Sequence, residues 1–228
     1  MIDVNLTEFK NLLNLAVAFT NEATFVVNGD RLELLVLDAT HVAMARGSIA
    51  LSSKPEVGSF SVKADQLQKA LSTVGETAKM EIKDGILTIK GEKSKARQSL
   101  IMPESNALKV PNFNICAHAV IQPSRLKTAF AYGSLTRADH VKIVITDGHL
   151  IVVTGEYPNN AEIDGDEDGE GSAVAGFMLD YIQTIVDLAI KAKSNLTIGM
   201  GGDDRPAWFS WGSETAIYSV LVAPRIES

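Results

Sequence analysis

The sequence predicts an α+β protein built from two similar halves. Its 228 residues are enough for two hydrophobic cores of ordinary domain size. An amphipathic helix, a hairpin, further strands, a second helix and a second hairpin follow one another, and this order occurs twice. Between the halves lies a segment with two prolines, three asparagines and no clear period, which is a linker composition. We therefore predict domains at 1–101 and 116–228, joined by a connector at 102–115.

In the first half, two helices are predicted from apolar residues spaced i, i+3, i+4 and i+7. The first covers residues 7–19 with Thr7 as its N-cap, and the second covers 65–74 with Asp65 at its cap. The expected β-structure consists of a hairpin about Asn28-Gly29-Asp30, short strands within 42–51 and 58–63, and a hairpin about Asp84-Gly85.

The second half is predicted to repeat this order. Its helices cover 123–135, where Pro123 suits a first helical turn, and 179–193. A hairpin about Asp147-Gly148 follows the first of these helices, and a closing hairpin spans 194–212. The hairpin turns of the two halves are separated by roughly half of the chain, as a duplication requires. A chance likeness of two α+β patterns is the alternative.

Composition excludes several classes of protein. Hydrophobic residues make up 46% and charged residues 21% of the chain, which is ordinary for a globular protein and excludes a disordered or fibrous one. The single cysteine, Cys116, excludes an intramolecular disulfide framework and indicates a reducing compartment. We expect this cysteine to be buried in an apolar strand. No apolar run reaches the length of a membrane helix, and the N-terminus lacks the pattern of a signal peptide.

The formal net charge of −7 argues against a protein held to DNA by a strongly basic surface. The acidity is concentrated, because residues 159–171 hold six acids and no base. The remaining surface therefore has room for a local basic face. Residues 164–169 match the start of a calcium-binding loop, but position 12 is Ala175 in place of the bidentate glutamate. A solvated acidic loop is predicted there instead.

The sequence offers no catalytic set. The histidines have no partner at the spacing of a zinc site, and no nucleotide-binding or serine-hydrolase motif is present. Gly199-Met200-Gly201-Gly202 is interpreted as a turn within the closing hairpin. We therefore predict no enzyme activity, no metal and no cofactor. The polar faces of the four helices carry scattered bases, which are either ordinary solvated faces or a surface for nucleic acid.

Several motifs resemble the DNA sliding clamp family that includes proliferating cell nuclear antigen. Residues 34–45, LLVLDATHVAMA, resemble its Asp-x-x-His-Val stretch, and residues 218–228, YSVLVAPRIES, resemble its C-terminal ending. VKADQLQKAL at 62–71 and KDGILTIKGE at 83–92 fall where the family has its second helix and the following hairpin. The resemblance covers nearly the whole chain and favours the archaeal and eukaryotic type of clamp.

The resemblance implies a ring. Each family subunit has two similar domains with antiparallel sheets outside and four helices on the inner face, and three subunits enclose duplex DNA. It implies a DNA polymerase processivity factor that also tethers a clamp loader, flap nuclease and ligase through short peptide motifs. The compartment would be the cytoplasm of an archaeon or the nucleus of a eukaryote. The alternative is a monomeric or hetero-oligomeric clamp-like module that binds peptide motifs without forming a stable homotrimeric ring.

By this resemblance, the family's functions fall on three sets of residues. The inner helices would contact double-stranded DNA, independently of its sequence, through Lys10, Lys69, Arg125, Lys127 and Lys191. Loops and the connector would form the partner-peptide groove from Leu37, His41, Val42, Met44, Leu108, Val110, Pro111, Pro206, Leu221, Ala223 and Pro224, unless these residues only pin the connector down. Subunits would join through edge strands carrying Lys95, Arg97, Ser99 and Ile101, and Asn159, Ala161 and Ile163.

Two acidic features modify these expectations. The second edge strand lies beside six acids, so we expect a labile, salt-dependent homotrimer, or a ring built with other subunits. On the fourth helix, Asp180 and Asp187 reduce the positive potential that a DNA-facing surface needs.

Overall fold

The computed structural model describes residues 4–52, 58–74, 79–91, 94–102, 108–112, 114–135, 137–147, 149–156, 159–164 and 169–225. Contacts divide the chain into two compact units, residues 1–109 with 213–218 and residues 110–212 with 219–228. The division after Lys109 lies inside the segment predicted as a connector. Strand β16, Ala216–Val222, contributes residues to both units.

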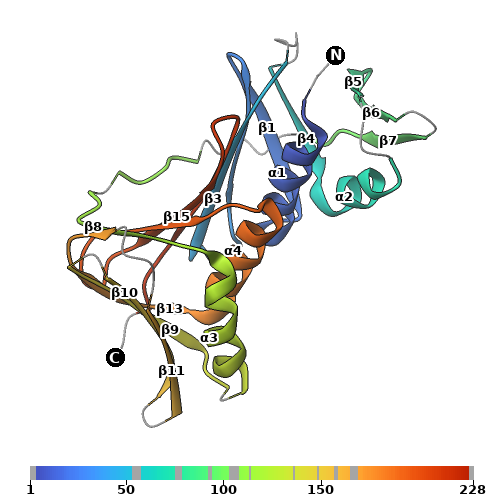
Figure 1. The fold of residues 1–228 in the computed structure, drawn as a ribbon. Helices are drawn as coiled ribbons and strands as arrows, with labels where there is room; N and C mark the ends of the chain where they lie inside the picture. Colours follow the sequence, from blue (N-terminus) through green and yellow to red (C-terminus); the bar gives the residue numbers. More distant parts are fainter. Residues whose placement is uncertain are drawn as a thin grey trace. The chain divides into compact units, whose positions relative to one another are not determined.

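Among its described residues, the first unit contains two helices and seven antiparallel strands besides its part of β16 (Figure 1). Four strands are hydrogen-bonded in the order β4-β1-β2-β3, and a separate three-stranded sheet has the order β5-β6-β7. The elements are α1 Leu6–Phe19, β1 Glu22–Asn28, β2 Arg31–Leu37, β3 Ala43–Ala50, β4 Ser59–Lys63, α2 Ala64–Ser72, β5 Lys79–Lys83, β6 Ile86–Lys90 and β7 Lys95–Ser99.

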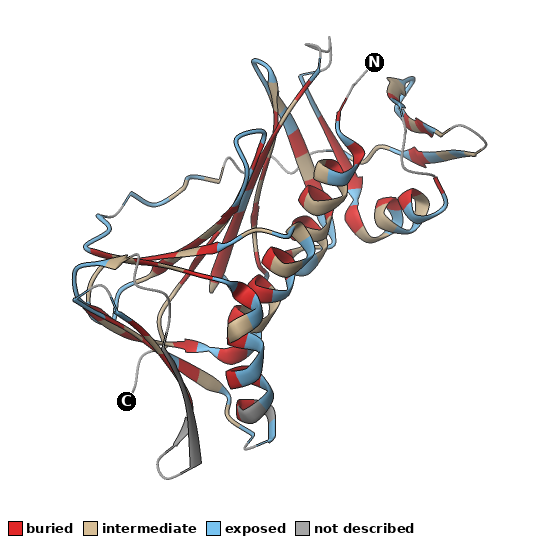
Figure 2. Ribbon diagram, viewed as in Figure 1, coloured by how far each residue is buried: buried red, intermediate tan, exposed pale blue. Residues whose placement is uncertain are grey.

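The apolar stripe predicted for the first helix is buried against the sheet. Phe9 and Leu12 of α1 are fully buried, and the Phe9 ring lies 5.6 Å from the ring of Phe25 in β1. Gly47 in β3 permits this close packing, because a Cβ atom there would lie 2.1 Å from the Leu12 side chain. Burying each such side chain contributes about 1.5–3 kcal/mol relative to exposure. Figure 2 shows the buried and exposed sides of each helix.

The second unit contains, among its described residues, two helices and two antiparallel sheet regions besides its part of β16. The strand orders are β12-β8-β14-β15 and β11-β10-β9-β13. The elements are β8 Ala117–Ile121, α3 Pro123–Leu135, β9 His140–Thr146, β10 His149–Glu156, β11 Asn159–Asp164, β12 Gly169–Glu170, β13 Ala173–Met178, α4 Leu179–Ala192, β14 Leu196–Met200 and β15 Ala207–Gly212.

Helix α3 lies close to β10 at a buried hydroxyl. Thr154 of β10 is fully buried, and its Oγ1 donates a hydrogen bond of 2.8 Å to the carbonyl oxygen of Ala129. A Cβ atom on Gly133, one turn further along α3, would lie 3.0 Å from the Thr154 side chain. The small residue therefore lets the helix approach the strand. Helix α4 contacts α3, β9 and β13, so both helices of this unit pack on its sheets.

The α+β fold class, the antiparallel sheets and the four helices are confirmed for the described residues. The helix predicted at 123–135 has the same bounds as α3, and the one predicted at 179–193 ends one residue earlier, at Ala192. The turn prediction at Gly29 is also confirmed, with a φ of 62° that glycine adopts without strain. Apolar periodicity and turn residues therefore determine these elements locally.

Both predicted N-caps are wrong. The side chain of Asn5 accepts hydrogen bonds from the N–H groups of Thr7 (2.9 Å) and Glu8 (3.2 Å), so α1 starts earlier than predicted and Asn5 is its cap. Helix α2 starts after Lys63, which makes no side-chain capping hydrogen bond. Asp65 lies in the first turn of α2, where its charge is favourable near the positive end of the helix dipole.

Two other predictions are also corrected. Cys116 is exposed, because β8 begins at Ala117, which is buried, and successive side chains point to opposite faces. Gly199 and Met200 belong to β14, so the turn of the closing hairpin starts at Gly201. Part of the predicted acidic loop is strand, in β11 and β12, while residues 165–168 lie outside the described residues.

Candidate functional site

Lys10 and Lys69 are the predicted DNA-contacting bases of the first unit. Lys10 lies half-buried on α1. Lys69 lies on α2, and its Nζ atom is 3.3 Å from Oδ2 of Asp65, one helical turn earlier. The two helices are in contact, and Gln68 of α2 donates a hydrogen bond of 2.8 Å to the side-chain oxygen of Asn14 in α1. Both bases therefore belong to one helix pair, and Lys69 already shares its charge with a carboxylate.

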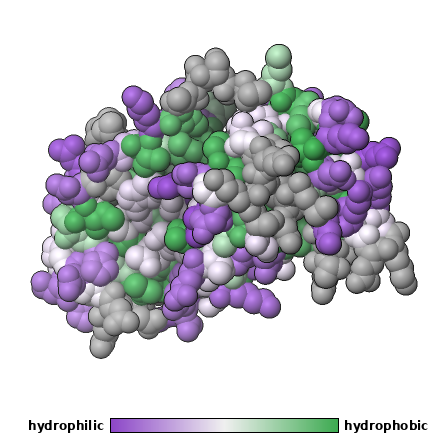
Figure 3. Space-filling view, turned by 90° about the horizontal axis from the view of Figure 1, so that it is seen from above, coloured by the Kyte–Doolittle hydropathy of each residue, from purple (hydrophilic) through white to green (hydrophobic). Residues whose placement is uncertain are grey.

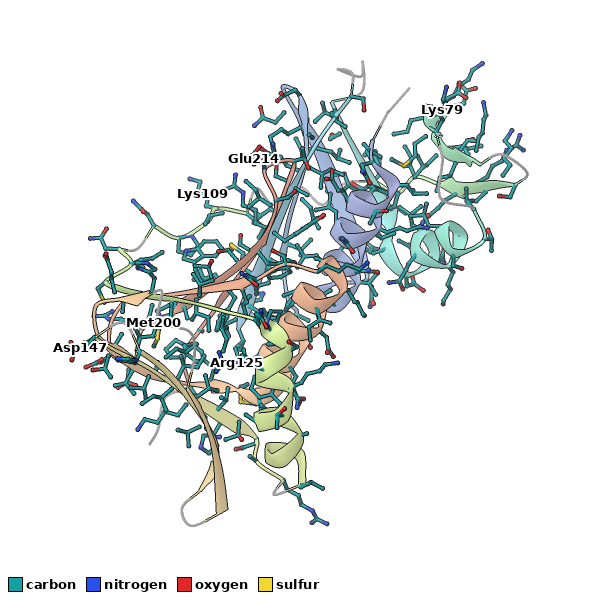
Figure 4. The ribbon with its side chains drawn as sticks, in the orientation of Figure 1. Lys79, Lys109, Arg125, Asp147, Met200 and Glu214 are labelled. Carbon is teal, nitrogen blue, oxygen red and sulfur yellow. The ribbon has the colours of Figure 1, made fainter. Side chains whose placement is uncertain are left out.

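Arg125, Lys127 and Lys191 lie on the contacting helices α3 and α4 of the second unit. Figure 4 labels Arg125 in the first turn of α3. The Nζ atom of Lys127 lies 3.1 Å from Oδ1 of Asp187 on α4, and the side chains are 58% and 53% exposed. Such an exposed ion pair contributes about 0.2–1 kcal/mol, so Lys127 is held only weakly. Lys191 is exposed in the last turn of α4.

The Asp-x-x-His-Val motif forms a tight turn between β2 and β3. Asp38 is buried, and its carboxylate accepts hydrogen bonds from the backbone N–H groups of Thr40 (3.0 Å) and Ala43 (2.6 Å) and from the Thr40 hydroxyl. His41 is exposed and has a φ of 62°, in the left-handed region. The buried carboxylate therefore fixes the turn, and the histidine is presented to solvent.

The apolar groove candidates of the first unit differ in exposure. Val42 precedes β3 and Leu108 lies in the connector, and both are partly exposed. Leu37 is the last residue of β2 and is also partly exposed, whereas Met44 lies in β3 and is only 9% exposed. The expected loop position is therefore wrong for Leu37 and Met44, because Leu37 ends β2 and Met44 lies inside β3.

In the second unit, the turn that carries Pro206 is attached to β13, the edge strand of its sheet. The N–H group of Val174 donates to the Asp203 carboxylate (2.9 Å), and the Val174 carbonyl accepts from the N–H group of Asp204 (2.9 Å). Pro206 follows in the same turn and is partly exposed. The roles of Asp203 and Asp204 could not be predicted from the sequence, because only the fold brings their turn to β13.

The C-terminal segment is attached to the same edge strand. The N–H group of Arg225 donates a hydrogen bond of 2.8 Å to the carbonyl of Gly176 in β13. Ala223 and Pro224 lie between the end of β16 and this attachment and are partly exposed. Leu221 was expected on a loop, but it is buried within β16. Three of the groove candidates of this unit, namely Pro206, Ala223 and Pro224, therefore lie on segments attached to β13.

A side-chain contact reinforces this attachment. The Nη1 atom of Arg225 lies 2.7 Å from Oδ1 of Asp139, and Nδ1 of His140 lies 2.7 Å from the same oxygen. Hydrogen bonds from His140 and from Arg225 lower the pKa of Asp139 to about 2. The backbone carbonyl of Asp139 also accepts from the N–H group of Leu179 (2.9 Å), at the start of α4. Asp139 is therefore fixed to the unit and ionised near neutral pH.

The connector enters the second unit on β14. The N–H group of Cys116 donates to the carbonyl of Met200 (2.9 Å), and a Cβ atom on Gly199 would lie 2.9 Å from the Ile115 side chain. The glycine therefore leaves space for Ile115. Further back in the connector, Val110 is partly exposed and Pro111 is exposed. Residues 103–107 and 113 lie outside the described residues.

Both strands predicted for the subunit interface lie at sheet edges. β7 pairs with β6, and β11 pairs with β10; within the described ranges no strand pairs with the other side of either one. Lys95, Arg97 and Ser99 lie on β7, whereas Ile101 follows it and bonds to Ser61 of β4 through its N–H group (3.0 Å). Asn159, Ala161 and Ile163 all lie on β11.

A cavity of about 280 Å³ lies between α2 and the segment that contains β7. Arg97, Ser99 and Ile101 contribute to its lining, together with Gln98. The Gln98 amide donates to the carbonyl of Lys63 (2.9 Å), and its buried Oε1 atom has no hydrogen-bond partner among the described residues. Three of the predicted interface residues therefore border one hollow on the first unit.

Exposed apolar side chains are scattered over the surface. Figure 3 shows hydrophobic side chains in separate patches among hydrophilic ones on the face that it presents. Among the described residues, the large and strongly exposed ones include Met102, Ile115, Leu135 and Ile217. No group of three or more metal-ligating side chains occurs in the described part of the chain. Nor is any described helix long and apolar enough to cross a membrane.

Comparison with known proteins agrees with the motifs. No protein-family model matches the chain. A curated relative, DNA polymerase sliding clamp 1 of Pyrobaculum aerophilum, is 25% identical and the alignment covers 98% of this chain and 97% of the relative. Among solved structures, proliferating cell nuclear antigen (PCNA) of A. fulgidus, bound to the C-terminal region of FEN-1, has a TM-score of 0.89 at 20% identity, covering 100% of both chains.

Two further solved structures share the fold over almost the whole chain. PCNA of Thermococcus kodakaraensis has a TM-score of 0.86 at 18% identity, and the PCNA2–PCNA3 complex of Sulfolobus tokodaii has a TM-score of 0.84 at 15% identity. Each covers 99% of this chain and 99% of the other chain. The chain therefore has the DNA clamp fold, and its resemblance to the sliding clamps of the PCNA family is confirmed.

Proposed function

We propose that this chain is a DNA sliding clamp, a processivity factor that encircles duplex DNA and tethers DNA polymerase to it. The observation that carries the proposal is the clamp fold over the full chain, together with whole-length similarity to a relative named as a DNA polymerase sliding clamp. Because a clamp stays on DNA by enclosing it, the function requires no catalysis by this chain. A cytoplasmic location in an archaeon suits the Pyrobaculum relative.

The five helix bases are proposed to contact the phosphate backbone. Lys69, Lys127 and Lys191 are exposed, and two of these three have exposed carboxylate partners. Contacts to phosphates carry no sequence information, which suits a protein that slides. Weak contacts also suit it, since each neutralised phosphate adds to affinity and would slow movement along the duplex.

The second role is to dock partner enzymes through short peptide motifs. The C-terminal region of FEN-1 is bound to the A. fulgidus clamp, whose fold this chain shares. We propose that Pro206, Ala223 and Pro224 contact such a peptide in this chain. Their partial exposure on segments attached to β13 supports the proposal. DNA polymerase, a clamp loader, a flap nuclease and a ligase are the partners expected.

Ring assembly is proposed to join the β7 edge of one subunit to the β11 edge of the next. Lys95 and Arg97 on the first edge and Glu162 and Asp164 on the second carry opposite charges. Exposed charge pairs are screened by salt, so subunit association should weaken as the salt concentration rises. The PCNA2–PCNA3 complex of Sulfolobus tokodaii gives weight to a second candidate, in which this chain assembles with a different clamp chain.

The decisive experiment measures DNA synthesis by a cognate polymerase and clamp loader on a primed circular template and on a linear one with free ends. A sliding clamp should lengthen the products on the circle and less so on the linear template, from which a ring can slide off. Equal product lengths with and without the chain on both templates would contradict the proposal. Sedimentation over a range of protein and salt concentrations then distinguishes a homotrimer from a monomeric module.

A further inference from the structure

We propose that the ion pair between Asp139 and Arg225 positions the C-terminal docking segment, so that Asp139 governs partner affinity without touching the partner. The inference rests on the proposed docking function. Ala223 and Pro224 have no regular structure of their own, because β16 ends at Val222. Their position is therefore set by β16 on one side and by Arg225 on the other.

Arg225 is held at two points. Its N–H group donates to the carbonyl of Gly176 in β13 (2.8 Å), and its Nη1 atom lies 2.7 Å from Oδ1 of Asp139. The first bond fixes the backbone, and the second fixes the side chain. Without the second, a segment that has no regular structure and is tied by one backbone hydrogen bond would open often.

Asp139 is a firm support for this contact. Its backbone carbonyl accepts from the N–H group of Leu179. Its carboxylate, whose pKa is lowered by the contacts with His140 and Arg225, is ionised at neutral pH. The residue precedes β9, a strand that pairs with β13 from His140 to Ile145. Gly176 lies in this sheet and Asp139 immediately precedes it, so together they hold Arg225 at a defined place beside β13.

A binding segment that is already ordered in the free protein binds more tightly, because it loses less conformational entropy when the partner binds. Loss of an exposed ion pair of this kind corresponds to a change in affinity of up to about five-fold. The effect should be largest at low salt and should fade as salt screens the pair. A contribution from packing alone would not depend on salt in this way.

The test measures binding of a fluorescent peptide from the C-terminal region of FEN-1 to the full chain by anisotropy. Asp139→Ala is expected to weaken binding by up to about five-fold at low salt. Arg225→Gln should weaken it at least as much, and the double variant should bind like Arg225→Gln alone, because both changes break one contact. Glu81→Gln breaks an ion pair with Lys90 in the other unit that is also largely exposed, and it should leave binding unchanged.

Hydrogen exchange of the Arg225 amide provides a readout without any partner. Exchange should be faster in Asp139→Ala than in the unaltered chain, and Glu81→Gln should leave it unchanged. If Asp139→Ala binds the peptide as the unaltered chain does, or if the two substitutions weaken binding additively, the positioning role is refuted while docking stands. If the unaltered chain does not bind the peptide, the docking function itself fails, whatever the exchange rates are.

Discussion

Replacing Asp187 by asparagine should strengthen the contact of this protein with DNA. In the structure the Asp187 carboxylate lies 3.1 Å from the ammonium group of Lys127, and both side chains are more than half exposed. Any phosphate that Lys127 contacts must therefore compete with Asp187. The substitution removes this competitor and one negative charge from the helix pair, while asparagine keeps nearly the same size.

The magnitude follows from the geometry. Two unit charges about 4 Å apart in water interact by about 1 kcal/mol, which corresponds to about a five-fold change in affinity. If Lys127 then neutralises one further phosphate, the plot of log affinity against log salt concentration should steepen by about 0.9. Stability should change little, because an exposed ion pair contributes only about 0.2–1 kcal/mol.

Anisotropy titrations of a labelled duplex over a salt series measure both quantities. Asp180→Asn is the matched control, since it removes the same charge from α4 at an exposed position, and among the described residues Asp180 has no salt bridge to a lysine. Asp187→Asn should raise the affinity for DNA and steepen its salt dependence more than Asp180→Asn does. Adding Lys127→Ala to Asp187→Asn should remove this difference. Equal effects of the two asparagine substitutions would refute a specific pairing and leave only the general change in charge.

Three further predictions concern the framework. Gly47→Ala should destabilise the fold by about 1–3 kcal/mol, because the new Cβ would overlap the Leu12 side chain. Denaturant unfolding measures this loss, and an unchanged unfolding midpoint would contradict the close packing of β3 on α1. Asn5→Ala should cost about 1 kcal/mol through the lost cap, seen in the same assay, whereas Thr7→Ala should cost less. The pKa of Asp139 is lowered to about 2 in the fold, against about 3.9 when unfolded, so its contribution to stability is present above pH ~4. That contribution should fade as the pH falls from ~4 toward ~2. The melting temperature of Asp139→Asn should therefore lie below that of the unaltered chain above pH ~4, and the two should converge toward pH ~2.

The helices and hairpins could be predicted because their signals are local. The apolar spacing of Phe9, Leu12 and Ala16 specifies the buried face of α1 before any partner is known, and Gly29 specifies a turn. Helix ends were less predictable. Asn5 and Thr7 are both good caps by type, and only the backbone geometry decides that Asn5 accepts the two N–H groups.

The candidate site was predictable in its residue types but not in its contacts. The bases on the helices follow from sequence, yet the pairing of Lys127 with Asp187 joins two helices that only tertiary packing brings together. The burial of Met44 likewise depends on the extent of β3, which alternation of apolar residues leaves open. Arg225 lies in a motif visible in the sequence, but nothing near it in the chain indicates Asp139 as its partner.

Each unit places an aspartate beside a helix lysine that is proposed to contact DNA, but the pairs are built differently. In the first, Asp65 and Lys69 are neighbours on one helix, a spacing that any helical sequence can supply. In the second, Lys127 and Asp187 come from different helices. For a protein that must move along DNA, a lysine with a carboxylate neighbour can leave a phosphate without becoming unpaired, so each step between phosphates costs less than it would for an isolated base. The acidic residues on these helices are then compatible with sliding, and removing them should give tighter binding at the expense of mobility.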